Sequence, residues 1–357
     1  MRGTVFLVTG MIAILGAAAQ ESQGLRPVRD EIGFCWDAAQ MARLDAFLAM
    51  EAGGTLDGSA RSPQPLYAAI SPHDDYLYAG RTYYPLFSRL RCREALIIGL
   101  THGTVRKEIG DPEGVLILEN HRAWRGLSGS EVAISSLREH LKSALAESAL
   151  LVSDRAHQLE HSIEALVPWL QHYNPGVQIT PVMVTAMPEA RMDSVAAVLA
   201  GAVAAYLRQE NLQWGRDFIV LISSDANHYG VDFNNTPFGI DSSAHARAIA
   251  QDQRLVDTWL TGTLQPEKIG GLIGEITASD YHQSRNVLWC GRYSIPFGLK
   301  VVAQLAMQTG RPPLQGRLLR YDDTWSGGVL PLTQTGMGLT APFSLQHWVG
   351  FFSVGYY

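Results

Sequence analysis

Ionisable side chains follow three apolar runs of this 357-residue chain, at the point where each run ends. The runs are LYAAI, ALIIGL and FIVLISS, and each reads as a buried strand. The polar residues that follow them are His73, Asp74, Asp75, His102, Asp225 and His228. A fourth segment, NVLWCGR, places Cys290 just before a predicted helix. Loops beyond the carboxyl ends of strands in an open α/β sheet converge on one crevice, so these side chains are expected to meet.

Two imidazoles and a thiolate suit Zn, Cu or Fe and are a poor set for Mg or Ca. We therefore predict a metal site with His73, His102 and Cys290 as ligands. A helix N-terminus next to Cys290 would lower the pKa of its thiol. Asp225 or Asp74 could ligate as well, or orient a ligating histidine. His228 could be a fourth ligand, or a general acid/base whose ordinary pKa of about 6.5 suits proton transfer, with Asp225 orienting it.

The segment QLEHSIE adds Glu160, His161 and Glu164 at a predicted helix start. Carboxylates in a first turn complement the helix dipole, which is a purely structural alternative to a place in the pocket. The other candidates have such alternatives too: Cys290 as a small buried hydrophobe, and Asp225 as a cap in SSDAN. Three histidine-bearing strand ends together favour the metal site. Tyr76 and Tyr78 would form a pocket wall, or pack in the core.

Short β-rich runs alternate with longer amphipathic stretches, which indicates an α/β fold. The strands are continuously apolar, as expected for a central mixed, mostly parallel sheet flanked by helices on both faces. The predicted strands are 66–71, 95–100, 114–119, 177–186 and 217–224, with further strands at 316–323, 336–343 and 347–357. The predicted helices are 130–148, 161–173, 188–210, 242–262 and 292–310.

The first residues, MRGTVFLVTGMIAILGAAAQ, have the pattern of a cleavable signal peptide, with cleavage near Ala19. Its apolar run is short for a membrane span, which needs roughly 20 residues, although an uncleaved anchor is the alternative. We predict a periplasmic or secreted protein: signal peptide 1–19, a flexible segment 20–29, and one α/β domain 30–357. Cys35 and Cys92 could pair in such a compartment, or stay buried thiols.

Composition limits the partners. The hydrophobic fraction of 46% is enough for a large core, and the net charge of −6 comes without any basic run. These values predict no nucleic-acid partner and no strong membrane interaction after signal cleavage. A small-molecule substrate fits the expected crevice, and no protein partner can be named.

Several motifs resemble those of the Memo-like family, the B component of the AmmeMemoRadiSam system. SPHDDYLYAG resembles its PHAGYxYSG, ALIIGLTHGT its strand ending in GPSHH, and EHSIEALVPWLQ its EHSIE helix. VLISSDANHYG, WCGRYSIP and the final VGYY resemble its ISSDxSHYG, CGRxPI and VGY. The similarity runs in the same order from about residue 70 to the C-terminus. Two departures lie at the pocket rim: PHAGY becomes PHDDY, and GPSHH becomes GLTHG.

The resemblance implies a fold similar to LigB-type class III extradiol dioxygenases, with iron or copper held by His73, His102 and Cys290. Asp225 and His228 would line the same pocket. The expected function is therefore a redox-active Fe(II) or Cu protein with dioxygenase-type or small-molecule oxidation activity. The main alternative is a non-catalytic copper or iron carrier, or an interaction protein, of the cell envelope. A zinc hydrolase is a third alternative, and export would separate the chain from a cytoplasmic radical-SAM partner.

Overall fold

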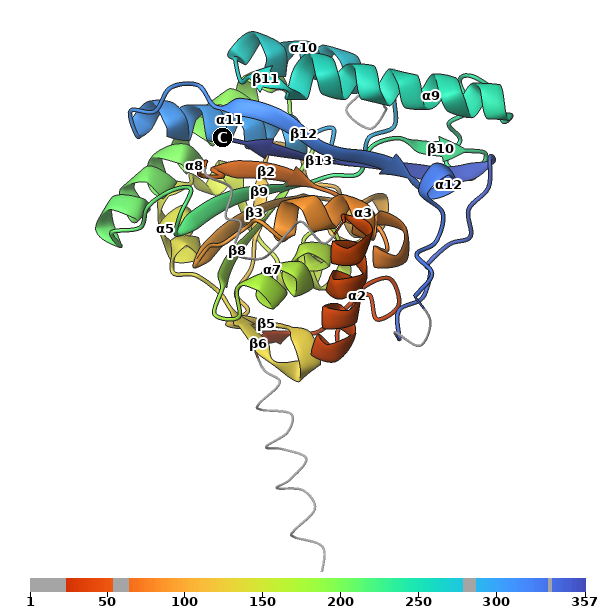
Figure 1. The fold of residues 1–357 in the computed structure, drawn as a ribbon. Helices are drawn as coiled ribbons and strands as arrows, with labels where there is room; N and C mark the ends of the chain where they lie inside the picture. Colours follow the sequence, from red (N-terminus) through yellow and green to blue (C-terminus); the bar gives the residue numbers. More distant parts are fainter. Residues whose placement is uncertain (1–23, 54–63, 279–286, 333–335) are drawn as a thin grey trace, which may run out of the picture.

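A computed structural model describes residues 24–53, 64–278, 287–332 and 336–357 of the chain (Figure 1). The predicted signal peptide lies outside these residues. A mixed sheet forms the centre, with strand order β11-β12-β13-β2-β9-β3-β8-β4-β7 and β10 paired to β13. Its strands are β2 (Ala68–Ser71), β3 (Glu94–Leu100), β4 (Leu116–Leu118), β7 (Leu150–Val152), β8 (Gln178–Val184), β9 (Phe218–Ser223), β10 (His228–Gly230), β11 (Gly262–Thr263), β12 (Gln315–Asp323) and β13 (His347–Tyr356).

The middle of this sheet is parallel, because β2, β9, β3 and β8 run in one direction. The strands β10, β11, β12 and β13 at one side pair antiparallel, as does β4 with β8. A small second sheet holds β1 (Leu25–Arg26), β5 (Ala123–Arg125) and β6 (Glu131–Ala133). The predicted class, a mixed sheet between helices, is confirmed, with parallel pairing in its middle and between β4 and β7.

Helices cover both faces of the sheet (Figure 1). The α-helices are α2 (Ala38–Glu51), α3 (Tyr76–Phe87), α4 (Gly103–Glu108), α5 (Leu137–Ala144), α6 (Asp154–Leu159), α7 (Val167–Tyr173), α8 (Glu189–Gln209), α9 (Ser242–Leu255), α10 (Pro266–Ile276), α11 (Ser294–Gln308) and α12 (Thr324–Gly327). Short 3-10 turns are η1 (Leu127–Gly129), η2 (Glu147–Ala149) and η3 (Glu164–Leu166), and η4 (Val256–Leu260) is a π-helical turn.

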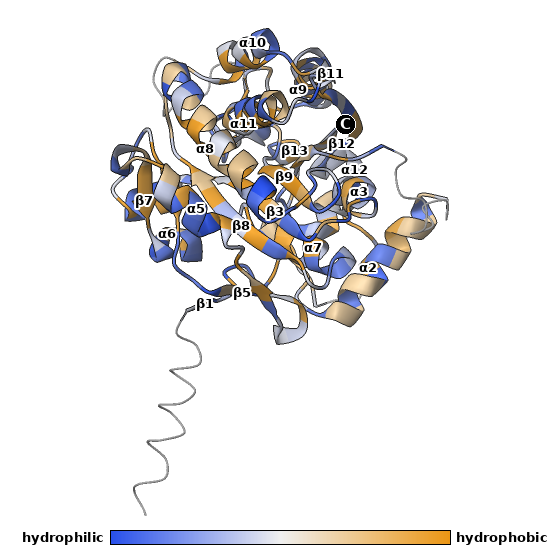
Figure 2. Ribbon diagram, turned by 90° about the vertical axis from the view of Figure 1, so that its left-hand side faces the viewer, coloured by the Kyte–Doolittle hydropathy of each residue, from blue (hydrophilic) through white to orange (hydrophobic). Residues whose placement is uncertain are grey.

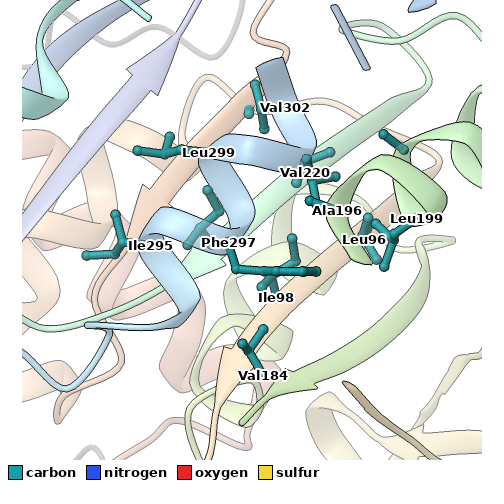
Figure 3. Packing of buried hydrophobic residues seen from close by; sticks show 14 of the residues in the cluster. Leu96, Ile98, Val184, Ala196, Leu199, Val220, Ile295, Phe297, Leu299 and Val302 are labelled. Carbon is teal, nitrogen blue, oxygen red and sulfur yellow. The ribbon is translucent and has the colours of Figure 1, made fainter. Parts of the chain in front are cut away.

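Strand side chains alternate between two hydrophobic cores, as the period of two requires. In β3, Leu96 and Ile98 join the core under α8 and α11, which Figure 3 shows from close by. Ala95 and Ile97 join the opposite core, under α2, α3 and α7. In Figure 2 the hydrophobic colour follows central strands such as β9, whereas α5 and α6 at the outside are largely hydrophilic. Among the described helices, α8 alone is long and apolar enough to cross a membrane. Half of its apolar stretch is buried, and these residues belong to the core that contains Leu96 and Ile98.

Two predicted elements differ in the structure, and the helix α3 was not expected. Residues 336–343 form no strand, because their backbone groups bond to side chains and loops rather than to a neighbouring strand. The predicted helix 130–148 begins instead as β6, which pairs with β5, and becomes helical only in α5. The helix α3 was not predicted, because it is buried nearly all round and so shows no amphipathic period. All three cysteines are free thiols, so Cys35 and Cys92 do not pair.

The segment 20–29 was predicted to be flexible, but its described part is tied down by Arg26. Arg26 is 1% exposed and forms an ion pair with the buried carboxylate of Glu164. Its guanidinium also donates to the carbonyls of His157 (2.8 Å) and Glu160 (2.7 Å). The same group lies 4.1 Å over the ring of Trp124, and β1 pairs with β5. A buried charge needs such partners, so this segment belongs to the domain.

We predict that Arg26→Ala lowers the free energy of unfolding by about 3–5 kcal/mol, because it leaves the Glu164 carboxylate buried without its partner. Urea unfolding followed by circular dichroism measures this change. Arg122→Ala, which breaks an exposed pair with Glu131, is the control and should have a much smaller effect. If Arg26→Ala lowers the free energy of unfolding as little as Arg122→Ala does, the N-terminal segment contributes little to stability.

Candidate metal centre

The carboxyl ends of three adjacent parallel strands bring the predicted residues together. His73 lies two residues after β2, Asp225 lies two residues after β9, and His102 lies just before α4, beyond the end of β3. The peptide N–H of His73 donates to the Asp225 carboxylate at 2.9 Å, which links the first two loops. The strand ends therefore share one crevice, as the topology requires.

Three imidazoles face one another in this crevice. The ring centroid of His73 lies 5.4 Å from that of His102 and 5.6 Å from that of His161. The rings of His102 and His161 are stacked with centroids 4.4 Å apart. One ring nitrogen of each histidine lies within 4.8 Å of the other two, which is a spacing that one ion could bridge. His161 was predicted only as a pocket residue, because the EHSIE segment reads as an ordinary helix start.

A second group of donor atoms shares His73. It consists of His73, Asp225 and Cys290, again with donor atoms within 4.8 Å of one another. The Cys290 sulfur lies 3.5 Å from His73 Nε2 and accepts from the Asp225 peptide N–H at 3.1 Å. Among the described residues, neither group contains both His102 and Cys290. The predicted set of His73, His102 and Cys290 thus takes members from both groups.

Two of the histidines bond to a neighbour through Nδ1, which leaves Nε2 to bind an ion; in His73 this nitrogen lies 3.5 Å from the Cys290 sulfur and 3.3 Å from the Asp225 carboxylate. The Ser223 hydroxyl donates to the carbonyl of Ser162 at 2.6 Å, so its oxygen accepts from His73 Nδ1 at 2.8 Å. His102 Nδ1 donates to the Glu160 carboxylate at 2.7 Å. Ligating histidines usually bond through their other nitrogen in this way, which fixes the tautomer. The residues present therefore fit a metal that prefers imidazole.

Burial controls the protonation of this cluster. Burial and the nearby histidines hold the pKa of His73 well below its usual value and lower that of His161 to about 3. Burial opposes ionisation of Glu160, but His102 more than offsets it and holds the pKa of this carboxyl well below 4.5. Glu160 in turn raises the pKa of His102 against the effect of burial. Glu160 thus favours a protonated His102, and burial favours neutral His73 and His161; an ion bound at His102 Nε2 would displace the proton from that nitrogen.

The predicted low pKa of Cys290 is wrong for the metal-free protein. Burial and the Asp225 carboxylate raise the pKa of the thiol well above 9.0. The helix α11 begins only at Ser294, and the one peptide N–H that donates to the sulfur belongs to Asp225. Cys290 is therefore a neutral thiol here, and a bound ion would be needed to deprotonate it.

His228 differs from its prediction as well. Burial and His102 lower its pKa to about 3, far from the expected 6.5. Its ring stands perpendicular to Phe233 at 5.1 Å, and Nε2 has no hydrogen-bond partner among the described residues. Asp225, which was expected to orient His228, bonds to His73 instead, and burial raises its pKa to about 7. His228 is thus a neutral imidazole with an available nitrogen.

A pocket of about 340 Å³ opens onto the three imidazoles. Aromatic rings form part of its wall, and Asp74 and Asp75 lie at its edge as predicted. Tyr78 lines the pocket, whereas Tyr76 is fully buried and donates to the carbonyl of Ala165. The main lining residues are Arg29, Asp30, Phe34, His73, Asp74, Asp75, Tyr78, His102, His161, Asp225, His228, Phe233, Thr340, Phe343 and His347. The pocket is large enough for a small ring compound.

A sequence model of the Memo-like protein family matches residues 41–327, which include all three imidazoles, Asp225 and Cys290. The chain belongs to the Memo-like family. A MEMO1 family protein of Methanothermobacter thermautotrophicus is 28% identical over 233 residues, which cover 64% of this chain and 75% of that protein. A relative from Thermococcus kodakarensis is 29% identical over 191 residues, covering 51% and 59%.

Other matches are shorter or more distant. A MEMO1 family protein of Metallosphaera sedula is 27% identical over 165 residues, and the match spans about half of each chain, 45% of this one and 52% of the relative. The crystal structure of the uncharacterized protein JW3007 from Escherichia coli K12 superposes with a TM-score of 0.42 at 12% identity. That superposition covers 81% of this Memo-like chain and 99% of the other.

The neutral histidines predict how stability depends on pH. His228 has a pKa of about 3 in the folded protein against about 6.5 when unfolded, so the unfolded chain binds more protons between these values. The free energy of unfolding should therefore fall as pH drops below about 6.5, by up to about 1.4 kcal/mol per pH unit for such a histidine. Urea unfolding of metal-free protein and of His228→Gln at pH 7, 6 and 5 tests this. The variant should lose less stability, and equal slopes would contradict the expectation.

Proposed function

We propose that this Memo-like protein binds Fe(II) or Cu through His73, His102 and His161 and oxidises a small molecule held in the adjoining pocket. The observation that carries this proposal is the orientation of the rings. Hydrogen-bond partners fix Nδ1 of His73 and of His102, and one ring nitrogen of each of these residues lies within 4.8 Å of a ring nitrogen of His161. Imidazole ligands suit iron and copper, and Zn remains the less favoured alternative.

The pocket supports a catalytic role over a closed storage site. The three imidazoles line a cavity of about 340 Å³, so an ion held by them would keep a position open to a ligand. An Fe or Cu ion there would supply electron exchange with O2 or an organic molecule. A dioxygenase-type or other small-molecule oxidation is the proposed class.

The chain's own residues would prepare the substrate. The rings of Phe34, Phe233 and Phe343 exclude water from one side of the pocket. Nε2 of His228, which has no hydrogen-bond partner among the described residues, can form a hydrogen bond with a substrate hydroxyl that reaches it and so orient the substrate. Ser223 and Glu160 keep the protons of His73 and His102 on Nδ1.

Metal analysis combined with oxygen uptake tests the proposal. Protein purified from its native compartment should contain Fe or Cu, and it should consume O2 with a phenol or a thiol. His228→Ala should keep the metal but lower O2 uptake by about tenfold, since a hydrogen bond that orients a substrate contributes about that much. Metal without any uptake by the wild type would favour the copper or iron carrier, and zinc would favour the hydrolase.

Two ligand variants separate the three-histidine set from the set predicted from the sequence. If His161 is the third ligand, His161→Gln abolishes metal binding and Cys290→Ser retains it. If Cys290 is the third ligand, Cys290→Ser abolishes metal binding and His161→Gln retains it.

Glu160→Gln should weaken metal binding about 10–100-fold, because it removes the carboxylate that orients His102. Competition with a chelator measures the affinity. Glu119→Gln is the matched control, since Glu119 is also fully buried and pairs with a histidine, His121, outside this pocket. A similar loss of metal affinity in both variants would point to general destabilisation instead.

A further inference from the structure

Both ends of the described chain contribute to the outer wall of the pocket. Residues 29–34 supply Arg29, Asp30 and Phe34, and residues 340–343 supply Thr340 and Phe343. Both segments lie outside the stretch that matches the family, 41–327. The imidazoles that line the pocket lie inside it. The two wall segments and the imidazoles thus come from different parts of the chain.

The carboxylate of Asp75 contacts both wall segments. It accepts from the peptide N–H of Thr340 at 2.6 Å and from the Thr340 hydroxyl at 3.0 Å. On its other side it lies against Gly33, where an added Cβ would come within 2.1 Å of Asp75 Oδ1. Although Asp75 is the N-cap residue of α3, its side chain makes no capping bond to the helix. The carboxylate therefore acts on the wall and not on its own helix.

Backbone bonds around Asp75 join the same segments. The peptide N–H of Tyr76 donates to the carbonyl of Gly33 at 2.9 Å. The peptide N–H of Gly338 donates to the carbonyl of Ile32 at 2.8 Å, which ties one wall segment directly to the other. The Tyr78 hydroxyl donates to the carbonyl of Ala341 at 2.8 Å. The start of α3 is thus the support on which both segments rest.

This support places two aromatic rings at the pocket. Phe34 packs on Tyr76 with ring centroids 5.2 Å apart, and Phe343 packs on Tyr78 at 5.6 Å in an edge-on arrangement. Phe34 and Phe343 both line the cavity. Their positions depend on how the two segments are held, because each ring belongs to a loop and not to a helix or strand.

We propose that Asp75 is a positioning residue that fastens residues 30–34 and 336–343 over the pocket, and that it thereby determines selection of ligands with a flat apolar ring. This proposal rests on the proposed function, since it assumes that ligands reach a metal at the imidazoles. Asp75 itself is not a ligand, as it belongs to neither group of clustered donor atoms.

Two probes that share a metal-binding nitrogen test the selection. Imidazole and 4-phenylimidazole differ only by a phenyl ring, and calorimetric titration of Cu-loaded protein gives the Kd of each. In the wild type the phenyl ring should improve binding through contacts with Phe34 and Phe343. In Asp75→Ala this advantage should fall about tenfold, which is the upper range for aromatic contacts. The Kd of imidazole should stay unchanged, and Asp75→Asn, which keeps an acceptor, should restore most of the advantage.

Asp241→Ala is the matched control. The carboxylate of Asp241 also accepts a peptide N–H, from Ala244 at 2.8 Å, at the start of α9 and away from this pocket. This variant should keep the full advantage of the phenyl probe. An unchanged advantage in Asp75→Ala, with imidazole still bound, would overturn the proposed selection.

Hydrogen exchange of the metal-free protein tests the fastening without a metal. Amides of both 30–34 and 336–343 should exchange faster in Asp75→Ala and at the wild-type rate in Asp241→Ala. Faster exchange in one segment alone, or in neither, would overturn the role of Asp75. If wild-type protein takes up neither Fe nor Cu, the proposed function fails, and this exchange measurement still decides whether Asp75 fastens the wall.

Discussion

The site depends on one buried carboxylate, that of Glu160. Its oxygens accept from the peptide N–H groups of His102, His161 and Ser162, each at 2.9 Å, and from the ring of His102. A carboxylate that is 1% exposed cannot stay charged without such partners. Because all of them come from the loops after β3 and α6, satisfying this one charge forces both loops to meet. The stacking of His102 and His161 follows from that meeting.

Arg26, which forms an ion pair with Glu164, also holds the backbone of Glu160 in place. The guanidinium donates to the backbone carbonyl of Glu160, so the position of the carboxylate depends on a residue that precedes the family match. Two ion pairs with buried carboxylates thus lie between the N-terminal strand and the imidazoles: Arg26 with Glu164, and Glu160 with His102. The backbone of Glu160 connects the two pairs.

Much of the fold could be predicted from the sequence, because the central strands are continuous apolar runs and the long helices have one apolar face. The convergence of His73, His102 and Asp225 followed from their place after parallel strands. What could not be predicted was pairwise geometry. His102 and Cys290 fall in different groups of donor atoms, and no spacing in the sequence reports which donors come within reach of one ion.

The protonation states of the site residues could not be predicted from the residue types either. His228 and Cys290 were assigned pKa values from local features, an imidazole's ordinary value and a nearby helix start. Burial among other charged groups outweighs both. One missed signal was readable: Asp37 before AAQMARLDAFLAME marks the start of α2, where its side chain accepts from Gln40. The glycine-rich stretch 336–343, by contrast, takes its shape from Asp75, which lies far away in the sequence.

The place of β13 in the sheet has a consequence for how the chain folds during synthesis. β13 lies between β2 and β12, and its residue Val354 pairs with Ile70 of β2. One edge of β2 therefore stays without its partner until the ribosome has made β13, long after β2 itself. Until then this edge is open to pairing with other chains, which is a recognised route to aggregation. A nascent chain would need a chaperone, or a delay in folding, to protect that edge.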